Sequence, residues 1–203
     1  MNFRTLFAAT EAMARSSNDC YRPLRGVHAG YIPNIIVQTH RNQKAWFYDD
    51  LLWRKTVLIH CMAVEDRESC ANVENLARVQ PLIGDELGRS VFIYSITTAP
   101  THDTPARLRM VAEKHGAKDG WSFLTGDGPS LELLRQRLFS HGGGQDCSMS
   151  LLRYGNETAG LWGGIMASAK PEAIAQRLAW ITSRKEVAGP YRRGGPPVLP
   201  EHE

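Results

Sequence analysis

The chain lacks any apolar run approaching the roughly 20 residues that a membrane-spanning helix needs, so it predicts no integral membrane segment. It also lacks clustered basic residues: the net charge is only +3, and the basic residues are scattered, with no more than two Lys or Arg side by side, as at Arg192-Arg193. A surface that follows nucleic-acid phosphates needs such clusters, and we expect no nucleic-acid partner. Glu11 interrupts the first apolar patch before it reaches the length of a signal-peptide core. We therefore expect neither a signal peptide nor an anchor and, as the chain reads, a cytoplasmic protein.

Cysteine is scarce as well. The 203 residues contain four, and no two of them form a C-x-x-C motif: Cys20, Cys61, Cys70 and Cys147. This number is too small for a disulfide scaffold and suits either a reducing compartment or a single functional pair. The glycines at 142–144 lack the following Lys-Ser/Thr of a phosphate-binding loop, so that segment reads as a flexible loop.

The length fits one domain with extensions. Residues 1–30 show no sustained period and predict an N-terminal arm, through which the chain could form a homo-oligomer. Residues 31–184 alternate between strand-like and helix-like patterns and predict the folded domain. Residues 185–203 are rich in proline and glycine and predict a tail without a packed element.

Within the domain, hydrophobic periodicity and turn residues define the expected elements. The helix at 104–115 has the strongest start signal, with Thr104 as N-cap and Pro105 at the first helical position. Pro81 is expected to kink or restart the helix that opens near Ser69 and runs toward Leu87. The expected strands are 34–39, 45–48, 57–62, 90–97, 121–126, 147–154 and 157–162, and the other helices are 129–139 and 171–184.

This order predicts an α/β fold, in which a mixed central sheet carries helices on both faces and begins with a β-hairpin. Right-handed crossovers make the strands at 57–62 and 90–97 parallel neighbours. The arrangement is thioredoxin-like, with a cysteine at the start of the first core helix.

Cys70 is the principal candidate for chemistry. A thiol in the first turn of a helix faces unpaired backbone N–H groups, which favour its thiolate as a nucleophile or a metal ligand. The other reading is a small buried hydrophobe, the commonest fate of a cysteine without a disulfide. Asp66, just before the helix, could be a metal ligand or a helix cap. Cys61 lies on the buried strand and is expected to be a packing residue. His60, on the same strand, is expected to be a hydrogen-bonded core or edge histidine and not a ligand.

The sequence resembles the Sco/SenC family of thioredoxin-like copper chaperones and thiol oxidoreductases. Four segments carry the resemblance: 55–59, 70–80, 95–105 and 121–126. The family binds copper through C-x-x-x-C at the strand-to-helix turn and through a distant histidine. An ungapped alignment through Leu76 puts the second cysteine on Cys70, the first on Asp66 and the histidine on Cys147.

The resemblance therefore implies that Cys70 and Cys147 converge, as a reversible disulfide or as a thiolate site for copper. Asp66 or His141 would be an optional further ligand of that metal. The implied function is electron transfer or metallocofactor assembly with a protein partner that accepts electrons or metal. If the chain is an enzyme, it is a thiol-disulfide oxidoreductase, and the family usually works on the periplasmic side of a membrane once a leader has been removed.

The sequence argues against two related enzyme classes. A thioredoxin needs a cysteine where Arg67 stands, and a peroxiredoxin needs Thr and Pro where Arg67 and Ala63 stand. We therefore expect neither activity.

The alternative function is a non-catalytic thioredoxin-like module that has lost copper binding and works through its surfaces.

Overall fold

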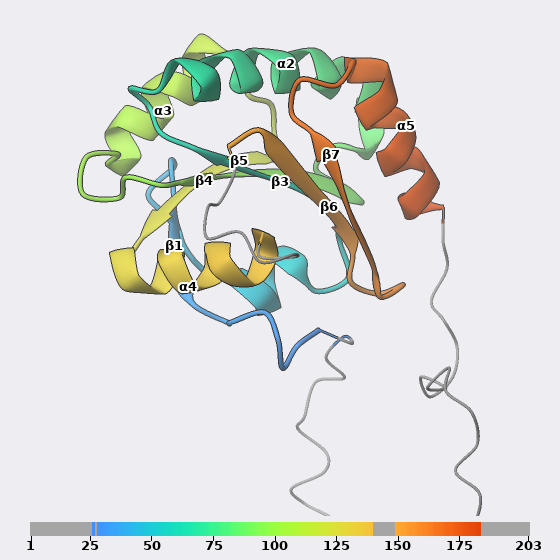
Figure 1. The fold of residues 1–203 in the computed structure, drawn as a ribbon, viewed down its shortest axis with the longest axis horizontal. Coiled ribbons are helices and arrows are strands. Elements are labelled where there is room, and N and C mark those ends of the chain that lie inside the picture. The colour runs from blue at the N-terminus through green and yellow to red at the C-terminus, as the bar shows by residue number, and fades with distance from the viewer. Residues whose placement is uncertain (1–25, 27, 140–148, 184–203) are drawn as a thin grey trace, which may run out of the picture.

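A seven-stranded mixed sheet forms the centre of the part of the chain that the structure describes. The structure is a computed structural model, and it describes Gly26 and residues 28–139 and 149–183. The strand order is β2-β1-β5-β4-β3-β6-β7 (Figure 1). In chain order the strands are β1 (Ile36–Thr39), β2 (Lys44–Trp46), β3 (Thr56–Met62), β4 (Val91–Thr97), β5 (Trp121–Gly126), β6 (Leu151–Asn156) and β7 (Leu161–Met166).

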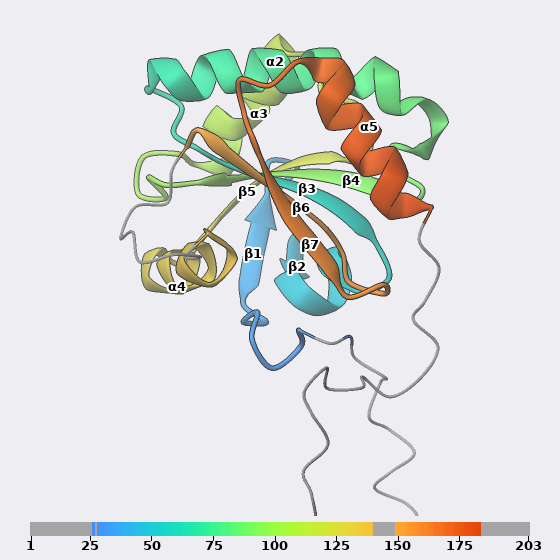
Figure 2. The same cartoon turned by 45° about the vertical axis from the view of Figure 1, so that its right-hand side comes forward.

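Helices cover both faces of this sheet, as the sequence predicts. In chain order they are the π-helical turn η2 (Phe47–Leu52), α2 (Arg67–Ile83), the 3-10 turn η3 (Gly84–Glu86), α3 (Pro105–Lys114), α4 (Gly128–Phe139) and α5 (Pro171–Thr182). Figures 1 and 2 show α2, α3 and α5 above the sheet and α4 with η2 below it. None of the described helices is both long and apolar enough to cross a membrane.

β3 separates two hydrophobic cores because its side chains alternate between the faces. Val57, Ile59 and Cys61 pack toward η2 and α4. Leu58 and Met62 pack toward α2, α3 and α5. All seven residues of β3 are buried, which explains why five of them are apolar.

The pairing of β3 agrees with its expected place in the sheet. β3 runs parallel to β4 along its whole length, from Thr56 opposite Val91 to Met62 opposite Thr97. This confirms the parallel neighbours that the sequence predicts. On its other side β3 pairs antiparallel with β6, and the N-terminal hairpin β1–β2 is also confirmed.

The end of α2 differs from the expectation. The helix continues through Pro81 to Ile83, and Gly84 then ends it with a φ of +64°. Pro81 lies in the last turn and lacks the N–H that would donate to the carbonyl oxygen of Ala77, and the helix ends two residues later. The extension toward Leu87 was wrong, because η3 occupies Gly84–Glu86 and a turn follows at 88–90.

The C-terminal hairpin is shifted relative to the prediction, which put the turn at Gly155-Asn156 and the strands at 147–154 and 157–162. Both turn residues instead belong to β6, and the chain turns at 157–160. The reason is steric: a side chain at position 155 would collide with Trp162 of β7, so a glycine is needed inside the strand.

Most of the predicted N-terminal arm and all of the tail at 185–203 lie outside the described residues.

Candidate functional site

The turn between β3 and α2 is fixed by two side chains. Asp66 is the N-cap of α2, and its Oδ2 accepts a 2.7 Å hydrogen bond from the backbone N–H of Ser69. The hydroxyl of Ser69 in turn accepts a 3.1 Å hydrogen bond from the N–H of Ala63. Short polar side chains are favoured at such positions because they satisfy N–H groups that the helix leaves unpaired. Of the two roles left open for Asp66, the structure shows the cap.

Cys70 lies in the first turn of α2, as expected, because the helix begins at Arg67. Its backbone N–H donates to the carbonyl oxygen of Asp66 at 3.1 Å. Its thiol is free, partly exposed and 3.8 Å from the carbonyl oxygen of Val64. The thiol is therefore reachable from solvent, unlike the buried thiol of Cys61.

A cavity of about 360 Å³ opens beside Cys70, between the first turns of α2 and the outer side of α3. Its wall is mostly apolar, and cationic side chains stand at its rim. The lining residues are Met62, Val64, Cys70, Val73, Arg107, Met110, Val111, Lys114 and His115. Burial, followed by the nearby charge of Lys114, lowers the pKa of His115. The cavity can thus accept an apolar group next to a thiol, with positive charge at its edge.

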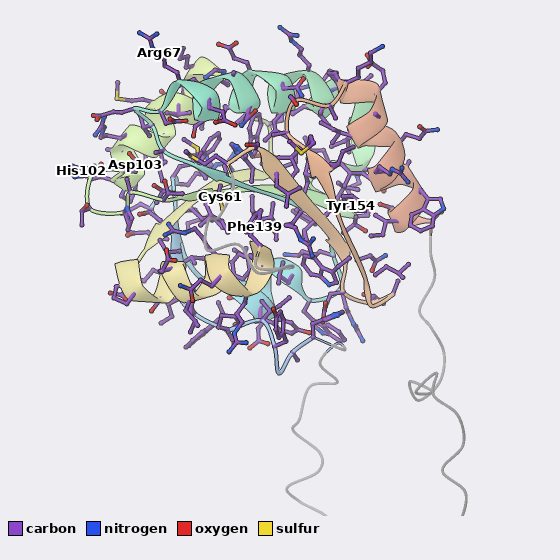
Figure 3. The ribbon with its side chains drawn as sticks, viewed as in Figure 1. Cys61, Arg67, His102, Asp103, Phe139 and Tyr154 are labelled. Carbon is purple, nitrogen blue, oxygen red and sulfur yellow. The ribbon has the colours of Figure 1, made fainter. Side chains whose placement is uncertain are left out.

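Asp103 holds the loop under this cavity, and the sequence analysis did not single it out. Its buried Oδ2 accepts hydrogen bonds from the hydroxyl of Thr97 at 2.6 Å and from the N–H of Val64 at 3.2 Å. Figure 3 shows Asp103 in the loop before α3, at the same end of the sheet as Arg67 at the start of α2. The sequence signal that could have identified Asp103 is its place directly before Thr104 and Pro105, which mark the start of a helix.

The chain returns to the start of α2 at Met149. The side-chain amide of Asn72 donates to the carbonyl oxygen of Met149 at 2.9 Å, and the hydroxyl of Ser69 donates to its sulfur at 3.1 Å. Met149 follows Cys147 by two residues. Cys147 and His141 themselves lie outside the described residues, so their approach to Cys70 stays a prediction.

A copper site needs several ligand side chains that converge on one point. Across Gly26 and the ranges 28–139 and 149–183, no three His, Cys, Asp or Glu side chains come together as a metal group. Cys70 is the one cysteine on the described wall of the cavity, and the carboxylate of Asp66 already accepts the helix-capping hydrogen bond. The described residues alone therefore do not fit a copper site.

Cys61 packs in the core, as predicted. His60 also lies in the core, but the hydrogen-bond partner expected for it is absent among the described residues. His60 is fully buried, and neither ring nitrogen has a hydrogen-bond partner among the described residues. Burial lowers the pKa of His60 to about 4, so the ring is neutral near neutrality.

Glu157 forms a second polar centre, which the sequence reading missed because it placed this residue in a strand. The carboxylate is buried and accepts four hydrogen bonds. The donors are the hydroxyl of Tyr48 at 2.6 Å, the indole N–H of Trp162 at 2.9 Å, and the backbone N–H and Nδ1 of His28 at 2.8 and 3.1 Å. Glu157 thereby ties the segment at 28–32 to the C-terminal hairpin, and no local sequence pattern announces such a contact.

Taken together, a mixed sheet with helices on both faces and a cysteine in the first turn of the helix after β3 define a thioredoxin-like fold. Comparison with solved structures supports this fold, and several of the similar chains are Sco proteins. The predicted resemblance to Sco/SenC is thus confirmed at the level of the fold.

Three of these structures illustrate the similarity. A Sco protein described by its disulfide switch, BsSco, has a TM-score of 0.62 at 15% identity, over 81% of this chain and 98% of its own. A SCO1/SenC family lipoprotein from Bacillus anthracis has a TM-score of 0.60 at 16% identity, over 79% and 98%. Copper-bound ScoI from Bradyrhizobium japonicum has a TM-score of 0.57 at 15% identity, over 72% and 96%. No protein-family model and no curated protein sequence matches the chain.

Proposed function

We propose that this chain is a divergent Sco-like thiol protein in which Cys70 reacts with a protein partner and Cys147 acts with it, in electron transfer or metallocofactor assembly. The observation that carries the proposal is the free thiol of Cys70 on the wall of the 360 Å³ cavity at the start of α2. An accessible thiol beside an apolar cavity can meet a partner's sulfur while the cavity accepts a neighbouring side chain.

The chemical step is thiol–disulfide exchange. The Cys70 thiolate attacks one sulfur of a partner disulfide, forming a mixed disulfide and releasing the other partner sulfur as a thiolate. The Cys147 thiolate then attacks the sulfur of Cys70 and releases the partner's second thiolate. The partner disulfide gains two electrons, and Cys70 and Cys147 lose them as they form their own disulfide.

Two observations support Cys147 as the second thiol. Met149, two residues beyond it, is hydrogen-bonded to Ser69 and Asn72 in the first two turns of α2. In addition, the structurally similar BsSco is described by a disulfide switch. The short chain distance from Met149 limits how far Cys147 can lie from the start of α2.

A copper-binding version needs ligands beyond the described residues. It would use Cys70 and Cys147 as thiolates, with His141 or Asp66 as a further ligand, and soft sulfur ligands suit Cu(I). A ligand role for Asp66 would compete with its cap on α2. The similar ScoI structure holds copper, which supports this version. We place it second because the described residues here present only one thiol at the cavity.

Intact mass with thiol alkylation tests the proposal on the full chain purified without chelator. After treatment with oxidised glutathione, we expect a protein lighter by two hydrogen atoms and a peptide that links Cys70 to Cys147. Cys70→Ser and Cys147→Ser should each abolish the link. Cys20→Ser is the matched control and should retain it.

The same measurement separates the alternatives. Copper that co-purifies with the wild type but not with Cys70→Ser would favour the metal version. If Cys70 gives neither a disulfide nor bound metal and the Cys70→Ser variant reacts like the wild type, the chain is a non-catalytic module.

A further inference from the structure

A second cavity lies on the opposite face of the sheet, between α4, the segment at 28–32 and the C-terminal hairpin. Its volume is about 50 Å³, and aromatic and aliphatic side chains form much of its wall. The lining residues are His28, Tyr31, Ile32, Arg137, Leu138, Arg153 and Trp162. Three of these are basic and none is acidic, which is unusual for a partly closed space.

Arg153 is the most informative residue of this cavity. It projects from β6 toward the α4 face, opposite Gly164 of β7, whose lack of a side chain leaves room for the guanidinium. Its Nε is buried and has no hydrogen-bond partner among the described residues. Burial lowers the pKa of Arg153, and the nearby Tyr31 and Tyr154 offset this effect only in part. A buried N–H donor without an acceptor destabilises the fold unless a ligand supplies one.

Arg137 approaches the same space from α4. Its guanidinium lies 5.2 Å from the centre of the Tyr31 ring, and no ion pair to it occurs among the described residues. Glu157 contacts two residues of the cavity wall, but its carboxylate already accepts hydrogen bonds from His28, Tyr48 and Trp162. Among the described residues, the two arginines therefore keep donors available that no carboxylate pairs with.

We propose that this cavity is a binding site for a small oxyanion, a carboxylate or phosphate group held between the guanidinium groups of Arg153 and Arg137. A volume of about 50 Å³ corresponds to one or two water molecules at about 30 Å³ each, which suits a single small oxyanionic group. Planar guanidinium groups bind these anions through paired hydrogen bonds. The site does not depend on the thiol chemistry of Cys70, which lies across the sheet.

Thermal unfolding of the full chain tests this site, with inorganic phosphate, acetate or chloride added at one ionic strength. We expect phosphate or acetate to raise the unfolding temperature in a saturable way that chloride does not reproduce. A response to phosphate alone identifies a phosphate-bearing ligand, and a response to acetate identifies a carboxylate. Equal unfolding temperatures in all three salts would overturn the proposal.

Variants assign the response to the two arginines. Arg153→Met should abolish it, and Arg137→Gln should weaken binding about ten-fold or more, as expected for lost charged hydrogen bonds. Arg78→Gln, an exposed arginine on α2, is the matched control and should respond like the wild type. An unchanged response in Arg137→Gln contradicts the site, even if Arg153→Met does not fold.

A purely structural role for Arg153 predicts a different result. In chloride, Arg153→Met should be at least as stable as the wild type, because it removes a half-buried charge that lacks a partner. A large loss of stability in chloride, together with an unchanged response of Arg137→Gln to phosphate and acetate, would show that Arg153 supports the fold and binds no anion.

Discussion

The hydroxyl of Tyr48 donates a 2.6 Å hydrogen bond to Oε1 of Glu157, across 109 residues of the chain, and both side chains are buried. The bond joins η2 to the turn between β6 and β7. It is the shortest of the four that Glu157 accepts.

Removing the hydroxyl of Tyr48 should destabilise the fold. Tyr48→Phe leaves a buried carboxylate short of one donor, and we expect a loss of about 1.5–3 kcal/mol in the free energy of unfolding, measured with urea. Tyr94→Phe is the matched control, because its hydroxyl donates to a neutral acceptor, the carbonyl oxygen of Leu51. That variant should lose only about 0.5–1.5 kcal/mol. Equal losses would show that the charge of Glu157 adds nothing.

Glu157 should also make stability depend on acid pH. Burial alone would raise its pKa, but the hydrogen bonds from His28, Tyr48 and Trp162 outweigh burial and lower it. The unfolded carboxyl, with a pKa of about 4.3, then takes up a proton before the folded one does. The contribution of Glu157 is complete above that value and is lost as the pH falls through the lower folded pKa.

Glu157→Gln tests this sign. The variant should be less stable than the wild type at neutral pH, and the difference should shrink as the pH falls below about 4. Urea midpoints measured over this range would contradict the argument if the difference stayed constant.

His60 adds a separate pH dependence in a higher window. Its folded pKa of about 4 lies below its ordinary value of 6.5, so protonation favours the unfolded chain as the pH falls from 6.5 toward 4. This shift contributes roughly 3 kcal/mol to the free energy of unfolding, and that contribution is present in full above pH 6.5. His60→Leu should lose this dependence and be as stable as the wild type at pH 7, because the ring nitrogens have no described partners to lose. A variant that keeps the wild-type pH profile would contradict this assignment.

Gly120 and Gly88 lie against each other where β5 begins, and their φ angles are +97° and +83°. A Cβ on Gly120 would come within 2.3 Å of the backbone nitrogen of Gly88. Gly120→Ala should therefore cost about 3–5 kcal/mol, from backbone strain together with overlap. Gly116→Ala is the control: φ is +60° with open space around it, so only the strain of about 1–2 kcal/mol applies. Similar losses in the two variants, measured by urea unfolding, would contradict the close approach.

The cap of α2 can be tested with two substitutions at one position. Asp66→Ala should destabilise the protein by about 1 kcal/mol, because the N–H of Ser69 loses its acceptor. Asp66→Asn should keep most of the stability, since asparagine is also a good N-cap. Urea unfolding of both variants decides the matter, and an equal loss in the two would contradict the cap.

The basic rim of the cavity should select among reagents that reach Cys70. Lys114 and Arg107 line the cavity, although Arg107 is also paired with Glu65 at 2.9 Å on the surface. At low salt, an anionic disulfide such as dithiodiglycolate should modify Cys70 faster than cationic cystamine, by roughly three-fold or more. The measurement is peptide mapping by mass spectrometry over time.

Charge reversal supplies the control for this prediction. Lys114→Glu should reduce or invert the preference, whereas Lys118→Glu makes the same change of net charge outside the cavity and should leave most of it. If the two variants behave alike, the selection reflects net charge alone.

Much of the fold could be predicted because its signals are local. Thr104 and Pro105 mark the start of α3, and the largely apolar β3 and β4 form the parallel pair inside the sheet. The turn predicted at Gly155-Asn156 was wrong, because Trp162 occupies the space where a side chain at position 155 would lie, and the pair belongs to β6.

The candidate site could be predicted only where its residues are close to one another in the sequence. Cys70 and Asp66 belong to one strand-to-helix turn, so their place in the first turn and at the cap follows from local sequence. Asp103 reaches Val64 across 39 residues, and His28 reaches Glu157 across 129. Such contacts depend on the order of strands in the sheet, which no short pattern specifies.

The place of β6 has a consequence for how the protein is made. β3 is an interior strand of the finished sheet, yet its antiparallel neighbour β6 begins only at Leu151. During synthesis, one long edge of an entirely buried strand stays open until the last quarter of the domain has left the ribosome. An open apolar edge pairs readily with other chains, so this interval is when the nascent protein is most exposed to aggregation.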